Sequence, residues 1–180
     1  AERLSGMVEE LLDFSRMQNG LTLECEKLDL AAEVSDAVLT MTPRAMQEGL
    51  TLRWEEPEAP VPVHADAARL KQVFINVLDN AVKYSPPGGP ITVELLQDGH
   101  NAFLNFTDEG RGIAPEDLEN VKTKFYKGKG AVRGSGIGLA VVDEIVTAHG
   151  GSLNLQSEVG RGTTVTVRLP LEAPKTHSAE

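Results

Sequence analysis

The sequence predicts an α+β fold, a two-layer sandwich in which helices cover one face of a mixed β-sheet. Long segments have the periodicity of amphipathic helices, and shorter segments between them alternate apolar and polar residues like half-buried strands. Two pairs of these strands are joined by short glycine-containing turns, which predict antiparallel hairpins. Hairpins that are followed and crossed by helices are typical of one sheet with its helices on a single face.

The first 18 residues predict a separate helix of the bundle type. Its apolar seam has the three-four-three spacing of a coiled coil or helical bundle and consists of Leu4, Met7, Leu11 and Phe14. Asn19 and Gly20 are typical of a helix C-terminus. A lone helix of this length is marginal in water, so we expect the seam to pack against another helix. We assign residues 1–20 to a partial bundle and residues 21–171 to the main domain.

The next segments predict a strand, a helix and a second strand. Alternation of apolar and polar residues indicates the first strand, and Asp29 is a candidate N-cap for the helix. The expected elements are a strand at Leu21–Leu28, a helix from Leu30 to about Gln47, a strand from Gly49 through Trp54 and a proline-rich loop over residues 55–62.

The second half of the chain predicts two further helices and both hairpins. Asp66 is the N-cap candidate of a long helix that ends before Pro86. The later elements are strands at Ile91–Gln97 and Ala102–Thr107, a short helix near Pro115, a helix from Gly136 to about His149, and strands at Ser152–Glu158 and Thr163–Leu169. The polar residues 172–180 are expected to form a disordered tail.

Composition limits the classes of protein to which the chain can belong. Its 180 residues, 41% hydrophobic, suffice for one well-buried domain with an appendage or for two small units. The net charge of −10 argues against a nucleic-acid partner, because such proteins present a basic patch to the phosphate backbone. The single cysteine, Cys25, favours a reducing compartment. No apolar run approaches the roughly 20 residues that cross a bilayer, so we expect a cytoplasmic location.

The helix after Asp66 carries the motif NVLDNAVKY, residues 76–84. Asn76, Asn80 and Lys83 share one helical face, because spacings of four and three residues bring side chains into register. Amide oxygens are hard ligands suited to a hydrated Mg²⁺ ion that carries phosphates, and a lysine offsets phosphate charge. The alternative is an ordinary polar stripe on a surface helix.

Two glycine motifs follow. In DEGRGI, residues 108–113, Gly110 and Gly112 allow a tight turn and the close approach of a flat group. Asp108, at the end of a strand, can accept a hydrogen bond from an exocyclic amine such as that of adenine, although an ordinary Asp-Glu-Gly turn is equally compatible. GSGIGL, residues 134–139, leads into a helix whose free backbone N–H groups suit phosphate. It is neither a Walker A loop nor a convincing Rossmann fingerprint.

The segment between the glycine motifs concentrates positive charge in an otherwise acidic chain. Its basic residues include Lys124, Lys127, Lys129 and Arg133. Basic residues on a glycine-rich loop are usually only solvated. Because this loop joins the two glycine motifs and has few apolar residues, we favour a mobile lid over phosphates.

Taken in order, these motifs resemble the catalytic and ATP-binding domain of bacterial sensor histidine kinases, which has the Bergerat ATP-binding fold. The resemblance covers about residues 28–170. NVLDNAVKY is similar to the family's N box, DEGRGI to its first glycine box, the region of Phe125 to its F box and GSGIGL to its second glycine box. The segments DAARLKQV (66–73), HGG (149–151) and GTT (162–164) also lie where the family has similar residues. Four boxes in family order make the resemblance specific.

The resemblance implies roles for the matching residues, with ATP and Mg²⁺ as ligands. Asn76 and Asn80 would hold Mg²⁺ and phosphate oxygens, and Lys83 would contact phosphate. Tyr84 would pack near the nucleotide, and Asp108 would bind the adenine amine. The remaining nucleotide-binding candidates, from the glycine boxes and the lid, are Gly110, Gly112, Ile113, Lys127, Arg133, Gly134, Ser135, Gly136, Ile137, Gly138 and Leu139.

Two positions within the resemblance carry alternatives. Thr163 would support the Asp108 end of the pocket, although a strand threonine chosen for β-propensity fits equally well. The F box commonly has a second phenylalanine three residues before Phe125, where this chain has Lys122. We expect this departure to affect the packing of the lid and not the nucleotide site.

The opening helix, which includes LLDFSRM (11–17), resembles the second helix of the family's dimerisation and phosphoacceptor hairpin. The first helix of that hairpin, which would carry the phosphorylated histidine, is absent from the sequence. None of the chain's histidines lies in a fitting context; they are His64, His100, His149 and His177. The implied partners are the acceptor helix of the parent kinase, a response regulator and, in the parent, a second copy in a homodimer.

Other proteins with this fold leave alternatives. ATP hydrolases such as DNA gyrase resemble the N box but place a glutamate, the general base for water, four residues before the second asparagine, where this chain has Asn76. Transfer to a protein histidine therefore fits better than hydrolysis. A serine kinase of the anti-sigma-factor type lacks a dimerisation hairpin, so the opening helix argues against it. A nucleotide-binding module without transfer activity stays open.

Overall fold

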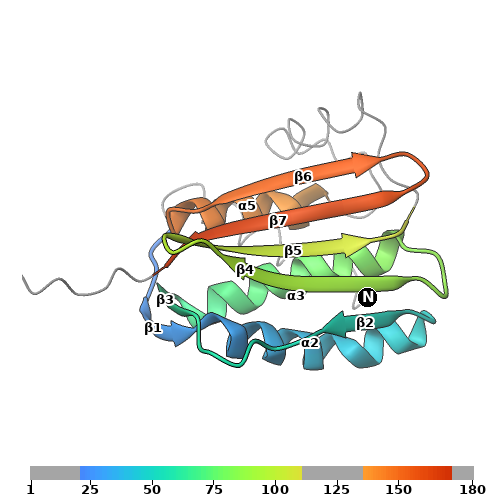
Figure 1. The fold of residues 1–180 in the computed structure, drawn as a ribbon. Coiled ribbons are helices and arrows are strands. Elements are labelled where there is room, and N and C mark those ends of the chain that lie inside the picture. Colours follow the sequence, from blue (N-terminus) through green and yellow to red (C-terminus); the bar gives the residue numbers. More distant parts are fainter. Residues whose placement is uncertain (1–20, 111–135, 172–180) are drawn as a thin grey trace, which may run out of the picture.

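A computed structural model of the chain describes residues 21–110 and 136–171. In this part of the chain a five-stranded sheet is covered on one face by three helices (Figure 1). The expected bundle helix at residues 1–20, the short helix near Pro115 and the tail at 172–180 lie outside the described residues.

The sheet is mixed, as predicted. Its strand order is β2-β4-β5-β7-β6, in which β2 and β4 run parallel and the other neighbours antiparallel. The strands are β2 (Thr51–Trp54), β4 (Pro90–Gln97), β5 (Asn101–Asp108), β6 (Ser152–Glu158) and β7 (Gly162–Pro170). The helices on its covered face are α2 (Leu30–Gln47), α3 (Ala67–Tyr84) and α5 (Gly136–Ala148). This arrangement confirms the predicted α+β sandwich.

Both predicted N-caps are confirmed. The Asp29 carboxylate accepts a hydrogen bond from the backbone N–H of Ala31 at 3.1 Å, at the start of α2. The Asp66 carboxylate accepts one from Arg69 N–H at 3.1 Å, at the start of α3. Each cap satisfies a donor that the helix geometry leaves without a partner, so the two helices begin where the sequence places an aspartate.

The prediction for the first strand was partly wrong. The strand β1 covers only Glu26–Asp29 and pairs antiparallel with β3 (Pro62–Ala65), a strand that the sequence reasoning missed. The two form a separate two-stranded sheet. The strand β3 is short and begins at a proline after a proline-rich loop, so only the buried Val63 and Ala65 mark its inner face. Because β1 pairs only as far as its partner extends, it is shorter than the alternation at Leu21–Leu28 suggested.

The core lies between the sheet and the helices, with α3 at its centre. Phe74 of α3 and Phe106 of β5 are fully buried, with ring centroids 6.2 Å apart. The other face of the sheet is polar, and hydrogen bonds cross it between the hydroxyls of Thr107 and Thr164 (3.2 Å) and from the Thr166 hydroxyl to Asn105 Oδ1 (2.7 Å). Within the described residues, no helix combines the length and the apolar character that a membrane span needs. The helices therefore bury one face of the sheet and leave a hydrogen-bonded polar face.

Candidate nucleotide site

The asparagine face of α3 lies outside the core. Apolar residues of α3, including Phe74 and Leu78, are buried against the sheet and the neighbouring helices, whereas Asn76 and Asn80 are only half-buried. Lys83 is exposed on the last turn. The helical register therefore turns the predicted ligands away from the core, where a ligand can reach their polar atoms.

Lys83 has a partner that the sequence reasoning did not consider. Its ammonium lies 3.4 Å from Asp79 Oδ2, and Asp79 Oδ1 lies 2.6 Å from the guanidinium of Arg44 on α2. An ion pair between partly exposed groups contributes only about 0.2–1 kcal/mol, so Lys83 can leave Asp79 for a phosphate at low cost. Arg44 would still neutralise Asp79 when Lys83 moves.

Asp108 is a buried carboxylate at the end of β5, where only 8% of the residue is exposed. Its Oδ1 accepts hydrogen bonds from the backbone N–H groups of Gly110 at 2.8 Å and Thr163 at 3.3 Å. Both of these bonds end on Oδ1, so Oδ2 is left for a ligand donor as far as the described residues are concerned. Burial raises the pKa of Asp108, and the two backbone hydrogen bonds oppose that rise.

Two glycines fit tightly around Asp108. A Cβ atom on Gly110 would collide with the carbonyl oxygen of Tyr84, the last residue of α3. A Cβ atom on Gly162 would collide with the backbone carbonyl oxygen of Asp108, and its φ of +118° also favours glycine. The absence of side chains at these positions lets α3, β5 and β7 meet at one point.

Thr163 contacts Asp108 through its backbone. Its N–H donates to the Asp108 carboxylate, while its hydroxyl lies 2.8 Å from the hydroxyl of Ser157 on β6. A hollow of about 260 Å³ opens here and is lined by Thr107, Asp108, Gln156, Ser157, Glu158, Arg161, Gly162, Thr163 and Thr164. Any residue except proline could supply the N–H of Thr163, so β-propensity explains the choice of threonine at least as well as a direct role does.

The other predicted site residues are placed only in part. Gly136, Ile137 and Gly138 form the first turn of α5, and Leu139 is buried one position later. The helix therefore begins within the second glycine motif, as expected. The candidates that lie outside the described residues are Gly112, Ile113, Lys127, Arg133, Gly134 and Ser135.

The donor set around α3 fits a metal ion that is carried by phosphates. Within residues 21–110 and 136–171, no group of three or more His, Cys, Asp and Glu side chains could hold an ion alone. The two half-buried amides, Asn76 and Asn80, are separated by one helical turn and offer neutral oxygens. Mg²⁺ commonly binds through few protein oxygens and several phosphate and water oxygens, so this set suits Mg²⁺ with a nucleotide.

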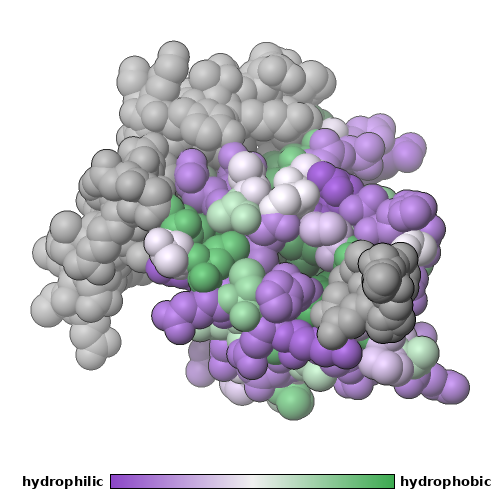
Figure 2. All heavy atoms as spheres, turned by 90° about the vertical axis from the view of Figure 1, so that its left-hand side faces the viewer, coloured by the Kyte–Doolittle hydropathy of each residue, from purple (hydrophilic) through white to green (hydrophobic). Residues whose placement is uncertain are grey.

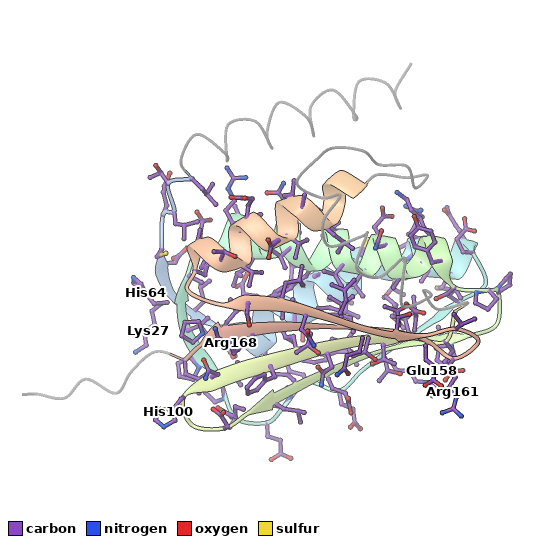
Figure 3. The ribbon with its side chains drawn as sticks, turned by 90° about the horizontal axis from the view of Figure 1, so that it is seen from above. Lys27, His64, His100, Glu158, Arg161 and Arg168 are labelled. Carbon is purple, nitrogen blue, oxygen red and sulfur yellow. The ribbon has the colours of Figure 1, made fainter. Side chains whose placement is uncertain are left out.

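The described histidines lie far from Asp108. Figure 3 shows His64 and His100 at one end of the molecule and Glu158 and Arg161, which line the hollow beside Asp108, at the other. His149 follows α5, at the same end as the start of α3 (Figure 1). These histidines therefore lie away from the hollow beside Asp108.

Comparison with known proteins gives consistent relatives. A family model for "Histidine kinase-, DNA gyrase B-, and HSP90-like ATPase" matches residues 65–173. Sensor protein SrrB of Staphylococcus aureus is 34% identical over 94% of this chain. The chain spans 21% to 30% of the length of the curated relatives that it matches.

Solved structures agree with these relatives. The mycobacterial sensor histidine kinase MprB is 32% identical, with a TM-score of 0.69, over 82% of this chain and 98% of that one. Full-length ShkA in complex with AMPPNP is 25% identical, with a TM-score of 0.82, over 96% of this chain and 36% of that one. The fold is therefore shared with sensor histidine kinases along most of the chain.

Because the carboxylate of Asp108 is buried, we expect the stability of the folded chain to depend on pH. The pKa of Asp108 is raised in the folded state, so ionised Asp108 opposes folding above that pKa and ceases to do so below the ordinary aspartate pKa of about 4. Asp108→Asn should therefore raise the thermal midpoint at pH 7, and each kcal/mol gained corresponds to about 2–4 °C in a domain of this size. The gain should shrink as the pH falls toward about 4.

Asp98→Asn is the control of opposite sign. Backbone N–H groups of His100 and Asn101 hold the pKa of Asp98 below its usual range, so its ionised form supports folding. Asp98→Asn should lower the midpoint at pH 7, with an effect that fades on acidification. A midpoint for Asp108→Asn that is below that of the unchanged protein at pH 7 would contradict the account of Asp108.

Proposed function

The chain belongs to the family of histidine kinase-, DNA gyrase B- and HSP90-like ATPases, as an ATP-binding domain of the sensor histidine kinase type, and from this premise we propose that it transfers the γ-phosphate of ATP to a histidine of its parent kinase. The acceptor is none of the four histidines of this sequence. The phosphoryl group then passes to an aspartate of a response regulator. Transfer from ATP to histidine to aspartate is the reaction of a two-component system.

The observation that carries this proposal is the identity of residue 76. It is Asn76, on α3 one turn before Asn80, where the hydrolases of the same fold have a glutamate as general base. An amide does not accept a proton near neutral pH, so Asn76 cannot activate water for attack on the γ-phosphate. A protein histidine needs no such base, because its neutral imidazole is already a nucleophile. Asn76 therefore supports transfer to a protein acceptor over hydrolysis.

Adenine recognition is assigned to the end of β5. Asp108 Oδ2 accepts a hydrogen bond from the exocyclic amine, while the N–H groups of Gly110 and Thr163 hold Oδ1 in place. Burial makes this bond selective, because a purine without the amine leaves a desolvated carboxylate without a partner. Gly110 and Gly112 give the purine room at the strand end, and Tyr84 and Ile113 pack near it.

Phosphate binding is assigned to α3, α5 and the segment between the glycine motifs. Asn76 and Asn80 supply amide oxygens to Mg²⁺, and Lys83 leaves Asp79 to contact phosphate. Mg²⁺ held by these amides would supply positive charge to offset that of the phosphates during transfer. The N-terminus of α5 offers free N–H groups. The other proposed contacts come from Lys127, Arg133, Gly134, Ser135, Gly136, Ile137, Gly138 and Leu139.

Two further observations support this assignment. ShkA, similar over 96% of this chain, is described as a complex with AMPPNP, an ATP analogue. His149 is already engaged, with Nδ1 at the carbonyl oxygen of Ile145 and Nε2 accepting from Asp66 N–H, which agrees with an acceptor on another segment. We propose that residues 1–20 supply the second helix of a dimerisation hairpin and that the parent is a homodimer, with this domain on the cytoplasmic side of a membrane-attached sensor.

Asn80→Ala should weaken Mg²⁺-dependent ATP binding by about tenfold or more, because loss of a ligand or of its support commonly costs that much. Affinity is measured by calorimetric titration with and without Mg²⁺, after circular dichroism has shown that the variant is folded. Asn154→Ala, at an exposed position of β6, is the control and should bind like the unchanged protein. Equal Mg²⁺-dependent affinity of Asn80→Ala and the unchanged protein would exclude this site assignment.

Transfer itself is tested by mixing the chain with γ-labelled ATP and a separate polypeptide that carries the first helix of the hairpin with its histidine. The expected result is label on that polypeptide, stable to base and labile to acid as phosphohistidine is. Bound ATP without a labelled acceptor would instead indicate a binding module. Release of labelled phosphate by the chain alone, without an acceptor, would indicate a hydrolase.

A further inference from the structure

Asp66 connects three segments that are distant in the sequence. Its Oδ1 caps α3 through Arg69 N–H, and its Oδ2 accepts a hydrogen bond from Glu24 N–H at 2.9 Å. Its own backbone N–H donates to His149 Nε2 at 3.1 Å. Burial alone would raise the pKa of Asp66, but the hydrogen bonds from Glu24, Arg69 and Ala68 outweigh it and hold the pKa below its usual range. The carboxylate is therefore ionised and engaged at both oxygens at neutral pH.

His149 acts as the link between α5 and α3. Its Nδ1 lies 2.8 Å from the carbonyl oxygen of Ile145 in α5, and its Nε2 accepts from Asp66. Because the carbonyl can only accept, this arrangement requires a neutral imidazole with its proton on Nδ1. We call the group formed by Glu24, Asp66 and His149 the clasp.

The two residues after His149 fix the same end of α5 to the sheet. Gly150 has a φ of +80° and ends the helix in the left-handed conformation. A Cβ atom on Gly151 would collide with the carbonyl oxygen of Arg168 on β7. The segment HGG thus joins the C-terminus of α5 to α3 through its histidine and to β7 through its second glycine.

The clasp and the candidate nucleotide site lie at opposite ends of one pair of helices. The helix α3 begins at the clasp and ends at Tyr84 beside Gly110, and α5 runs back from the second glycine motif to His149 (Figure 1). The 18 residues of α3 extend about 27 Å. A change in how the helices meet at the clasp therefore changes the separation between the asparagines and the start of α5 at the other end.

The segment at Glu24 lies at the surface of the molecule. Figure 2 looks onto this end of the molecule, where hydrophilic residues surround a small apolar area. Of residues 21–25, Leu21 packs against the core, while Glu24 and Cys25 are exposed. The hydrogen bond from Glu24 N–H to Asp66 Oδ2 therefore joins an exposed part of the chain just before β1 to the start of α3.

We propose that His149 is a positioning residue for nucleotide binding, which holds α3 and α5 in the relative position that the nucleotide requires and couples that position to the segment at Glu24. The proposal rests on the nucleotide site described above. Replacing His149 by leucine removes the acceptor for Asp66 N–H and leaves that buried donor without a partner. Glutamine restores an acceptor at a similar reach, because its Oε1 can take the place of the imidazole Nε2.

The test combines two variants with a measurement on the unchanged protein. We expect His149→Leu to bind Mg²⁺ATP about 5- to 20-fold more weakly, within the usual range of coupling between sites, and His149→Gln to bind within about threefold of the unchanged protein. Titrations are made well below each thermal midpoint, so that all of the protein is folded. In the unchanged chain, ATP should slow amide hydrogen exchange at Glu24 and Asp66.

The outcomes separate this inference from the proposed function. Equal affinity of His149→Leu and the unchanged protein, or a glutamine variant as weak as leucine, would show that His149 only stabilises the fold. Exchange at Glu24 and Asp66 that does not respond to ATP would overturn the coupling even if both variants failed to fold. If the unchanged chain does not bind ATP, both this inference and the proposed function fail. The other negative results would overturn only this inference and would leave the proposed function intact.

Discussion

The structure depends on the close approach of three elements around the carboxylate of Asp108. The end of β5 lies against the start of β7 because Gly162 has no side chain, and it lies against the end of α3 because Gly110 has none. The two backbone N–H groups that these turns supply hold one carboxylate oxygen and leave the other for a ligand, as far as the described residues show. Burial of a charge opposes folding here, as is common where a site must bind a polar ligand strongly.

The helix α3 links the fold to the chemistry. Its apolar face, with Phe74 at the centre, holds the helix on the sheet. Asn76, Asn80 and Lys83 lie outside this buried face, where a ligand can reach them. A rigid helix with a buried face gives the amides a fixed spacing, which a loop could not provide. The same helix begins at the clasp and ends at Tyr84 beside Gly110, so contacts with other elements fix its position at both ends.

Local signals in the sequence predicted most of the fold. Aspartate caps and hairpin turns are short-range features, and each was found where the sequence placed it. The strand β3 was missed because its four residues carry too little pattern. The Asp79–Lys83 pair has an i,i+4 spacing that the sequence could have shown. The Arg44–Asp79 ion pair, the tautomer of His149 and the backbone contact of Thr163 depend on residues distant in the sequence or on chain geometry, which periodicity does not reveal. The order of the motifs in the sequence indicated a nucleotide as the ligand. The contacts in the structure showed which groups hold the Asp108 carboxylate and the Lys83 ammonium in position.

We propose above all that the carboxylate of Asp108 recognises the exocyclic amine of adenine. The most direct measurement compares the affinity of the chain for ATP and for inosine triphosphate, which has an oxygen in place of that amine. A hydrogen bond to a charged group contributes about 1.5–3 kcal/mol, so ATP should bind at least tenfold more tightly, and Asp108→Asn should lose that preference. Equal affinity of the unchanged chain for the two nucleotides would contradict the account.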